Sequence, residues 1–140
     1  MTKKIFFDAN ILIDLTNAGN ELYEETLFLF DHFVRNRDQL YCSPTSFAIT
    51  YFFLNKTINN IQKLNKTAID FFSTFTFTRE DNIIMKKVIQ SDFTDLEDAL
   101  QYYSAEDCGV NIIITKNFFD FKKSSIPVYH PLQYLNEFLL

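Results

Sequence analysis

Short apolar runs alternate with longer amphipathic stretches along the chain, and this alternation predicts strands separated by helices. The first run, 5–7, is entirely apolar and ends directly at Asp8. The segment 74–78 alternates Thr and Phe, which is the two-residue period of a strand. The predicted strands are 5–7, 39–42, 74–78, 112–115 and 128–129.

Apolar residues recur at helical spacing between these runs. Ser43 and Pro44 mark the start of one helix, and Gly109 marks the end of another. Thr78, followed three residues later by Asp81, resembles a capping box with Asp in the Glu position, which predicts a helix that begins at residue 80. The predicted helices are 10–17, 21–37, one starting at 43–45 and carrying 47–54, 57–72, 80–90, 91–108 and 131–140.

Strands that alternate with helices favour a parallel sheet covered by helices on both faces. We therefore predict one domain over residues 1–140, with a three-layer α/β/α fold around a central parallel sheet of about four to five strands. The chain has only 2 Gly and 3 Pro, too few for an all-β fold with many tight turns.

Composition narrows the classes of function. The net charge of −5 gives no general basic surface for nucleic acid, although an acidic pocket that holds cations is compatible with it. Cys42 and Cys108 have no His or Cys partner at metal spacing, so we expect reduced thiols. Asp8 and Asp14 interrupt the apolar N-terminal stretch, which argues against a signal peptide or membrane span. We expect a cytoplasmic protein.

Asp8 follows the first predicted strand directly. In open α/β sheets, ligands bind beside the carboxyl ends of the strands, which is where Asp8 falls. Asp is also a preferred N-cap residue, and a helix is predicted to start just after it. Asp8 taken alone therefore leaves both capping and chemistry open.

The predicted helix 91–108 brings further carboxylates. Asp95, Asp98 and Tyr102 lie along one edge of its apolar face, whereas Glu97 falls on the far side. Carboxylates beside a buried face are costly unless a cation neutralises them. The helix dipole offers another explanation, which suits Asp95 better than Asp98.

The fourth predicted strand also ends in polar residues, Thr115, Asn117 and Asp120. In a parallel sheet this end lies on the same side as Asp8, so three separate segments are expected to converge. A cluster of oxygen ligands suits Mg²⁺ or Mn²⁺, which activate water and stabilise in-line attack on a phosphodiester. Asp120 taken alone also fits an ordinary loop residue.

Three segments carry a resemblance to a known family. They read FDANILID at 7–14, DLEDA at 95–99, and ITKN at 114–117 followed by Asp120 and Phe121. In order and spacing, over essentially the whole length, the chain resembles a PIN domain, and most closely the VapC-type toxins. The resemblance implies a PIN-like fold for 1–140 and a metal-dependent endoribonuclease, usually paired with an antitoxin protein and often a homodimer.

The resemblance also implies roles for single residues. By position, Asp8 matches the first acidic metal ligand of the family and Asp98 the third. Thr115 matches the hydroxyl residue ahead of the fourth acid, and Asn10 the small polar residue near the first. The metal ligands are thus expected to be Asp8 and Asp98, holding Mg²⁺ or Mn²⁺.

The chain departs from the family pattern at two positions. The second acid, usually Glu on the helix after the second strand, has no counterpart in 46–51, and Asn117 stands in place of the fourth acid. We expect Asp95, Asp120 or Glu97 to compensate, and the candidate catalytic residues are Asp8, Asp98, Asp95, Asn117 and Asp120. The alternative is a degenerate PIN domain that binds RNA or a protein without cutting, with the aromatic helix 47–54 as its interface.

Overall fold

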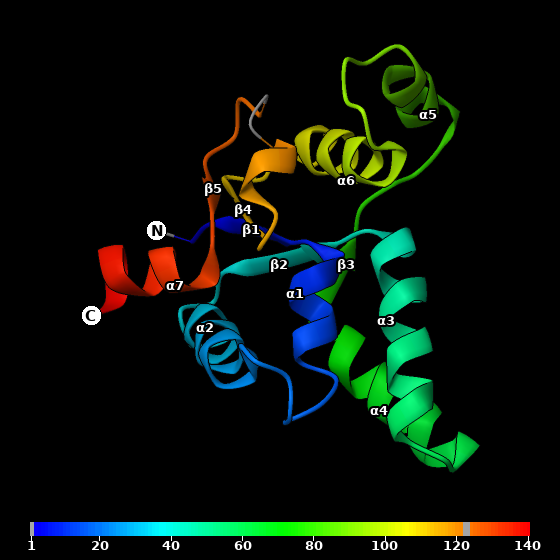
Figure 1. Ribbon diagram of the computed structural model, residues 1–140, viewed down its shortest axis with the longest axis vertical. Helices are drawn as coiled ribbons and strands as arrows, with labels where there is room; N and C mark the ends of the chain where they lie inside the picture. The colour runs from blue at the N-terminus through cyan, green and yellow to red at the C-terminus, as the bar shows by residue number, and fades with distance from the viewer. Residues whose placement is uncertain (1, 122–123) are drawn as a thin grey trace.

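A computed structural model describes residues 2–121 and 124–140, apart from the side chains of residues 119 and 120. Within this range, five parallel strands form one sheet in the order β3-β2-β1-β4-β5 (Figure 1). The first strand of the chain therefore lies at the centre of the sheet. The strands are β1 Lys4–Phe7, β2 Gln39–Cys42, β3 Phe75–Phe77, β4 Ile112–Ile114 and β5 Val128–Tyr129. The predicted parallel sheet is confirmed.

Helices connect successive strands, as the parallel order requires. The α-helices of the described range are α1 Ala9–Asp14, α2 Tyr23–Arg35, α3 Pro44–Thr57, α4 Ile61–Phe72, α5 Asn82–Ile89, α6 Leu96–Asp107 and α7 Pro131–Tyr134. A short 3₁₀ helix, η1, covers Phe118–Phe121, and a π-helical turn, η2, covers Leu135–Leu139. In the described parts of the chain, we find no helix with the length and apolar character needed to cross a bilayer.

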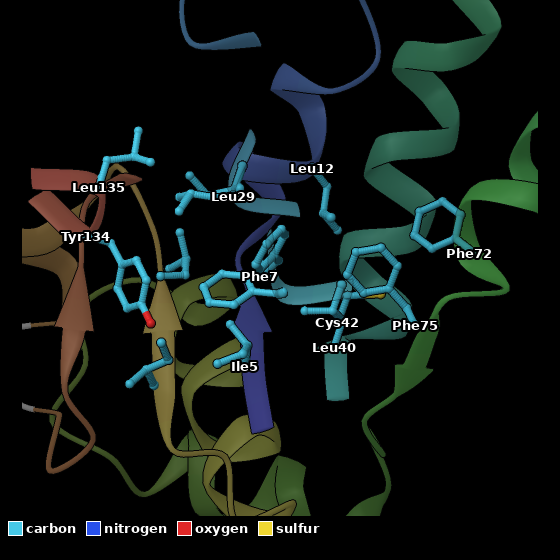
Figure 2. Close-up of a cluster of buried hydrophobic side chains, with 14 residues drawn as sticks. Ile5, Phe7, Leu12, Leu29, Leu40, Cys42, Phe72, Phe75, Tyr134 and Leu135 are labelled. Atoms are coloured by element: carbon cyan, nitrogen blue, oxygen red, sulfur yellow. The ribbon is translucent and has the colours of Figure 1, made fainter. Parts of the chain in front are cut away.

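Alternate side chains of β1 enter different layers of core, because successive residues of a strand point to opposite faces. Ile5 and Phe7 join a cluster with Leu12 of α1 and Leu29 of α2 (Figure 2). Phe6 joins a separate cluster on the other face, which includes Tyr102 and Ala105 of α6. Helices α5 and α6 lie on one side of the sheet, and α1, α2 and α7 on the other (Figure 1). The three-layer prediction is confirmed.

Several predicted helix starts are wrong. The helix predicted from residue 57 begins at Ile61 after a cap at Asn60, because α3 continues to Thr57. Two further starts are set by aspartate caps. The helix predicted from residue 80 begins at Asn82, and its N-cap is Asp81, whose carboxylate accepts from the Ile84 amide, rather than Thr78. The helix predicted from residue 91 begins only at Leu96, after a cap at Asp95. In both cases an aspartate nearer the apolar face satisfies the free N–H groups of the first turn, so the helix starts there.

Candidate active site at the carboxyl edge of the sheet

Asp8 lies at the turn between β1 and α1, and only 2% of its surface is exposed. It is the N-cap of α1, where its Oδ1 accepts a hydrogen bond of 2.7 Å from the Ala9 amide. Its own amide donates to the Ile114 carbonyl over 3.1 Å, which joins the turn to the end of β4. The capping role of Asp8 is thus present, and it holds the carboxylate at the ends of the two central strands.

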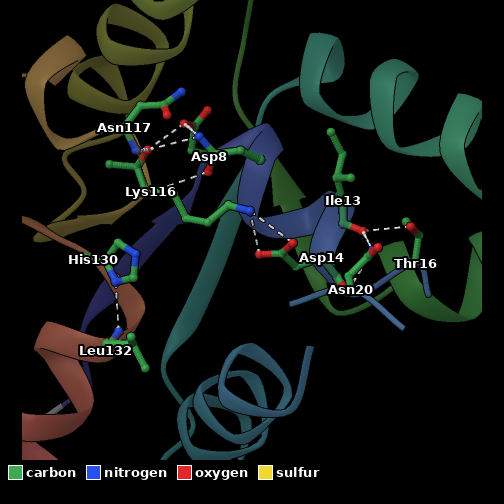
Figure 3. A network of polar contacts seen from close by, with 11 residues as sticks. Asp8, Ile13, Asp14, Thr16, Asn20, Lys116, Asn117, His130 and Leu132 are labelled. Atoms are coloured by element: carbon green, nitrogen blue, oxygen red, sulfur yellow. Dashed lines mark hydrogen bonds and ion pairs between the residues drawn. The ribbon is translucent and has the colours of Figure 1, made fainter. Parts of the chain in front are cut away.

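The second oxygen of Asp8 meets the polar residues that follow β4 (Figure 3). Thr115 Oγ1 donates to Asp8 Oδ2 over 2.7 Å, and Asn10 Nδ2 donates to the same oxygen over 2.9 Å. Thr115 Oγ1 accepts in turn from the Asn117 amide over 3.0 Å. Asn10 Oδ1 accepts from the Lys116 amide over 3.3 Å. Four predicted site residues, Asp8, Asn10, Thr115 and Asn117, are therefore brought together.

Burial governs the charge of Asp8. It raises the pKa of Asp8 to about 6, because removal from water penalises the ionised form. Hydrogen bonds from Thr115 and Ala9 lower this pKa, and the negative charge of Glu97 raises it. Every donor that we identify for this carboxylate in the described part of the chain is uncharged. A bound cation would offset the cost of burying the charge.

Helix α6 holds the acids of the second predicted segment. Asp95 is exposed, and its Oδ1 accepts from the Asp98 amide over 3.0 Å, which is the helix-terminus role left open by the sequence. Asp98 is partly buried and lies three residues before Gln101, so the two occupy neighbouring positions on the helix surface. Gln101 accepts from the Ala9 amide, which places this side of α6 against the turn that carries Asp8.

The position of Glu97 on α6 differs from the predicted one. Glu97 was expected on the far side of the helix, but its charge acts on Asp8. It lies four residues before Gln101, on the same side of α6. The predicted apolar face concealed this, because α6 buries Gln101, Tyr102 and Ala105, whereas Leu96 is 61% exposed. The side chain of Asp120 lies outside the described residues.

The start of α3, where the family pattern has an acid, carries no acid of its own. Ser46 is fully buried, and its hydroxyl donates to Gln101 Oε1 over 2.8 Å. Glu80, which arrives from the segment after β3, accepts from the amide and the hydroxyl of Thr45 over 2.7 and 2.6 Å. Sequence reasoning missed Gln101 and Glu80. The available signal for Gln101 was a polar residue between the buried positions of α6. Glu80 gave no such signal, because its contact with Thr45 joins residues that are far apart in the sequence.

Lys116 supports the site from the side away from Asp8. Its Nζ lies 2.9 Å from Oδ2 and 3.0 Å from Oδ1 of Asp14, at the other end of α1 (Figure 3). Burial and the charge of Lys116 lower the pKa of His130, whose Nδ1 accepts from the Leu132 amide over 3.1 Å. Asp14 therefore fixes the ammonium group of Lys116, and Asn10 Oδ1 fixes its backbone amide.

The donor set fits a hydrated divalent cation rather than a closed protein cage. Among residues 2–121 and 124–140, no three or more His, Cys, Asp or Glu side chains described here gather closely enough to hold a metal ion. Mg²⁺ commonly uses one or two carboxylates and keeps several waters. The buried carboxylate of Asp8, with uncharged partners, is the observation that favours a cation at this edge.

Comparisons with known proteins agree with this geometry. The PIN domain family model matches residues 4–118. The VapBC2 complex of Rickettsia felis bound to a DNA fragment from its promoter contains a similar chain, with 13% identity over 91% of this chain and 98% of that one, at a TM-score of 0.65. FitAcB from Neisseria gonorrhoeae contains another, with 15% identity over 91% and 98% at a TM-score of 0.65.

A third similar structure is VapC20 of Mycobacterium tuberculosis, a toxin that cleaves the sarcin-ricin loop. It shares 15% identity over 84% of this chain and 95% of that one, at a TM-score of 0.64. At such identities the likeness shows the fold alone. No curated protein sequence matches the chain. The family model matches residues 4–118, which is most of the chain, so the chain belongs to the PIN domain family.

Proposed function

We propose that this PIN domain is an endoribonuclease that depends on Mg²⁺ or Mn²⁺. The observation that carries the proposal is the buried Asp8 carboxylate, held at the carboxyl edge of the sheet by uncharged donors only. Such a group is costly to fold and serves to bind a cation. A cation bound there supplies charge stabilisation for the phosphodiester and an activated water.

The side chains of this chain divide the work. Asp8 and Asp98 are the residues that would hold the ion. Thr115 and Asn10 both donate to Oδ2 of Asp8 and so fix the plane of the carboxylate. Oδ1 takes one described hydrogen bond, from Ala9, which leaves it a lone pair for the cation. Asn117 is exposed beside this network, where its carboxamide would orient a water or an RNA oxygen.

We also propose a cytoplasmic location, an antitoxin partner and a homodimeric assembly. A cytoplasmic protein that cleaves RNA without restraint is toxic to its cell, so an antitoxin that binds the PIN domain is the expected partner. A homodimer is the expected assembly. Both follow from the resemblance to VapC-type toxins.

The test is cleavage of a mixed RNA substrate with Mg²⁺, with Mn²⁺ and with EDTA. Wild type is compared with Asp8→Asn and Asp98→Asn, each purified identically to control for contaminating nuclease. We expect cleavage that needs both the metal and the two carboxylates. Full activity of both variants, or activity in EDTA, would reject the assignment.

A second candidate function is binding without cleavage. Residues 46–51 of α3 contain no counterpart of the second acid, and Asn117 stands after β4 in place of the fourth. An apolar hollow of about 480 Å³ lies between α3, α4 and β3, and Phe47, Phe72 and Phe77 line it. Stable capture of a protein or RNA partner, together with no Mn²⁺ binding and no cleavage, would favour this function.

A further inference from the structure

Gln101 is a buried amide beside the proposed site. Only 1% of its surface is exposed, because it lies on the side of α6 that packs against the central strand. An amide removed from water is costly unless its oxygen and nitrogen both find partners. The partners of Gln101 therefore decide what the side chain does.

Two donors fix the orientation of this amide. The Ala9 amide and the Ser46 hydroxyl lie 3.1 and 2.8 Å from Oε1 of Gln101. A carbonyl oxygen has two lone pairs, so Oε1 is fully used and the amide nitrogen remains as a donor. The Ala9 amide also donates to Asp8 Oδ1 over 2.7 Å, so Gln101 and Asp8 share one donor and their side chains lie next to each other. A contribution of the Gln101 side chain to lowering the pKa of Asp8 agrees with this closeness.

The hydroxyl of Ser46 is itself held in place. Ser43 Oγ donates to Ser46 Oγ over 2.9 Å, and the Ser46 amide donates to Ser43 Oγ over 3.0 Å. Ser43 and Ser46 are both fully buried. The hydroxyl proton of Ser46 is therefore directed at Gln101. A row of hydrogen bonds between uncharged groups thus runs from Ser43 and Ser46 at the start of α3, through Gln101 of α6, to the Ala9 amide at the start of α1.

We propose that Gln101 is a positioning residue for Asp8 that acts through the Ala9 amide shared by the two side chains, and that Ser43 and Ser46 hold the Gln101 side chain in place. This rests on the proposed function, in which Asp8 binds the cation. Gln101 holds the Ala9 amide from the α6 side, whereas Thr115 and Asn10 donate to the Asp8 carboxylate from the β4 and α1 side.

The first experiment needs neither metal nor RNA. The side-chain amide signal of Gln101 is recorded by ¹H–¹⁵N correlation spectroscopy and assigned by its loss in Gln101→Met. We expect Asp8→Asn and Ser46→Ala each to shift this signal. Asp107→Asn, at the opposite end of α6, removes the same charge and is expected to leave it in place. A signal that either Asp8→Asn or Ser46→Ala leaves unmoved in a folded protein overturns the proposal.

The second experiment measures function. Gln101→Met keeps the volume of the side chain but removes its hydrogen bonds, and we expect kcat to fall about tenfold with little change in KM. Mn²⁺ binding, followed by calorimetry, is expected to weaken several-fold. Ser104→Ala is the matched control, because Ser104 is a buried serine on the same helix that bonds only to the Gln101 backbone carbonyl among its described contacts.

A double-mutant cycle decides whether Ser46 acts through Gln101. We expect Ser46→Ala to lower kcat in the wild type and to add nothing in the Gln101→Met background. Additive effects, or an unchanged kcat in Gln101→Met, overturn the proposal. A wild type that neither binds Mn²⁺ nor cleaves RNA instead rejects the proposed function, while the spectroscopic experiment still decides the contact between Gln101 and Asp8.

Discussion

Two buried aspartates stand at opposite ends of helix α1, and they differ in the partners that the fold gives them. Asp8 is 2% exposed and Asp14 is 5% exposed, so both carboxylates are withdrawn from water. Asp14 is neutralised by Lys116, whose Nζ lies 2.9 Å away. Asp8 receives hydrogen bonds from Ala9, Asn10 and Thr115, none of which carries a charge.

The difference supports the proposal that Asp14 is a structural acid and Asp8 a functional one. A buried charge is costly unless it is paired, and the pair at Asp14 meets that requirement within the chain. At Asp8 the fold supplies orientation without neutralisation, which leaves the carboxylate suited to a cation from solution. The comparison therefore locates the proposed metal site at one end of α1 and a supporting ion pair at the other.

The largest expected effect concerns catalysis. Asp8→Asn keeps the size of the side chain and removes the charge, so we expect cleavage to fall on the order of 100-fold or more. Asp14→Asn is the matched change at the other end of the helix, and its cleavage per folded molecule is expected to fall far less. The measurement is kcat on RNA with Mn²⁺. Equal losses in the two variants would contradict the separation of roles.

The next effect concerns stability. Lys116→Met leaves Asp14 buried without its cation, and we expect the free energy of unfolding to fall by about 3 kcal/mol. The estimate lies at the low end for buried pairs, because the Lys116 side chain is 32% exposed. Urea unfolding measures it. The double variant Asp14→Leu and Lys116→Met is expected to regain most of the loss, and no recovery would show that Lys116 stabilises through other contacts.

A third effect is the pH dependence of stability. The pKa of Asp8 is about 6 in the folded protein, against the ordinary value of 3.8. Between these values the unfolded chain has already lost the proton that the folded protein keeps, so stability falls as pH rises from about 4 to 6 and then levels off. The loss is about 2 to 3 kcal/mol.

Asp8→Asn is the control for this pH dependence. Because the variant lacks the titrating group, its stability is expected to stay level over the same range and to exceed that of the wild type at neutral pH. Excess Mn²⁺ is expected to reduce this difference in stability at neutral pH, because it binds the ionised Asp8 of the wild type. A wild type and variant with parallel curves would contradict a buried, uncompensated Asp8.

The convergence of Asp8 and Thr115 was predictable, because both follow apolar runs of β-strand length. Parallel pairing of such strands places both carboxyl ends at one edge of the sheet. The contact between the Asp8 amide and the Ile114 carbonyl confirms this juxtaposition. The continuous apolar run of β1 likewise indicated a buried strand, and Phe6 and Phe7 are buried on its two faces.

Residues of α6 were harder to place from the sequence. The apolar period gave neither the start of the helix nor its buried face, because α6 begins at Leu96, which is 61% exposed, and buries Gln101, Tyr102 and Ala105 instead. This change of face explains the different position of Glu97. Gln101 and Ser46 meet across 55 positions of sequence, and their hydrogen bond depends on how α3 and α6 pack around the sheet. Local propensity contains no information about such a contact, so this part of the site required the structure.

The smallest expected effect sharpens the contrast between Asp8 and the exposed acids. Asp95 caps α6 by accepting from the Asp98 amide, and Asn caps helices as well as Asp does. Asp95→Asn thus removes a charge and keeps the cap. We expect the free energy of unfolding to change by less than about 0.5 kcal/mol, whereas Asp95→Ala is expected to cost about 1 kcal/mol. Urea unfolding measures both variants.

Cleavage by Asp95→Asn then separates the two roles of this acid. If Asp95 serves only as a cap, its rate stays within about threefold of the wild type, because an exposed charge is screened by water and salt. A loss comparable with that of Asp8→Asn would instead show that the charge of Asp95 assists the reaction. In that case exposure would no longer distinguish supporting acids from those that hold the cation, and burial without a charged partner would cease to be the criterion for the site.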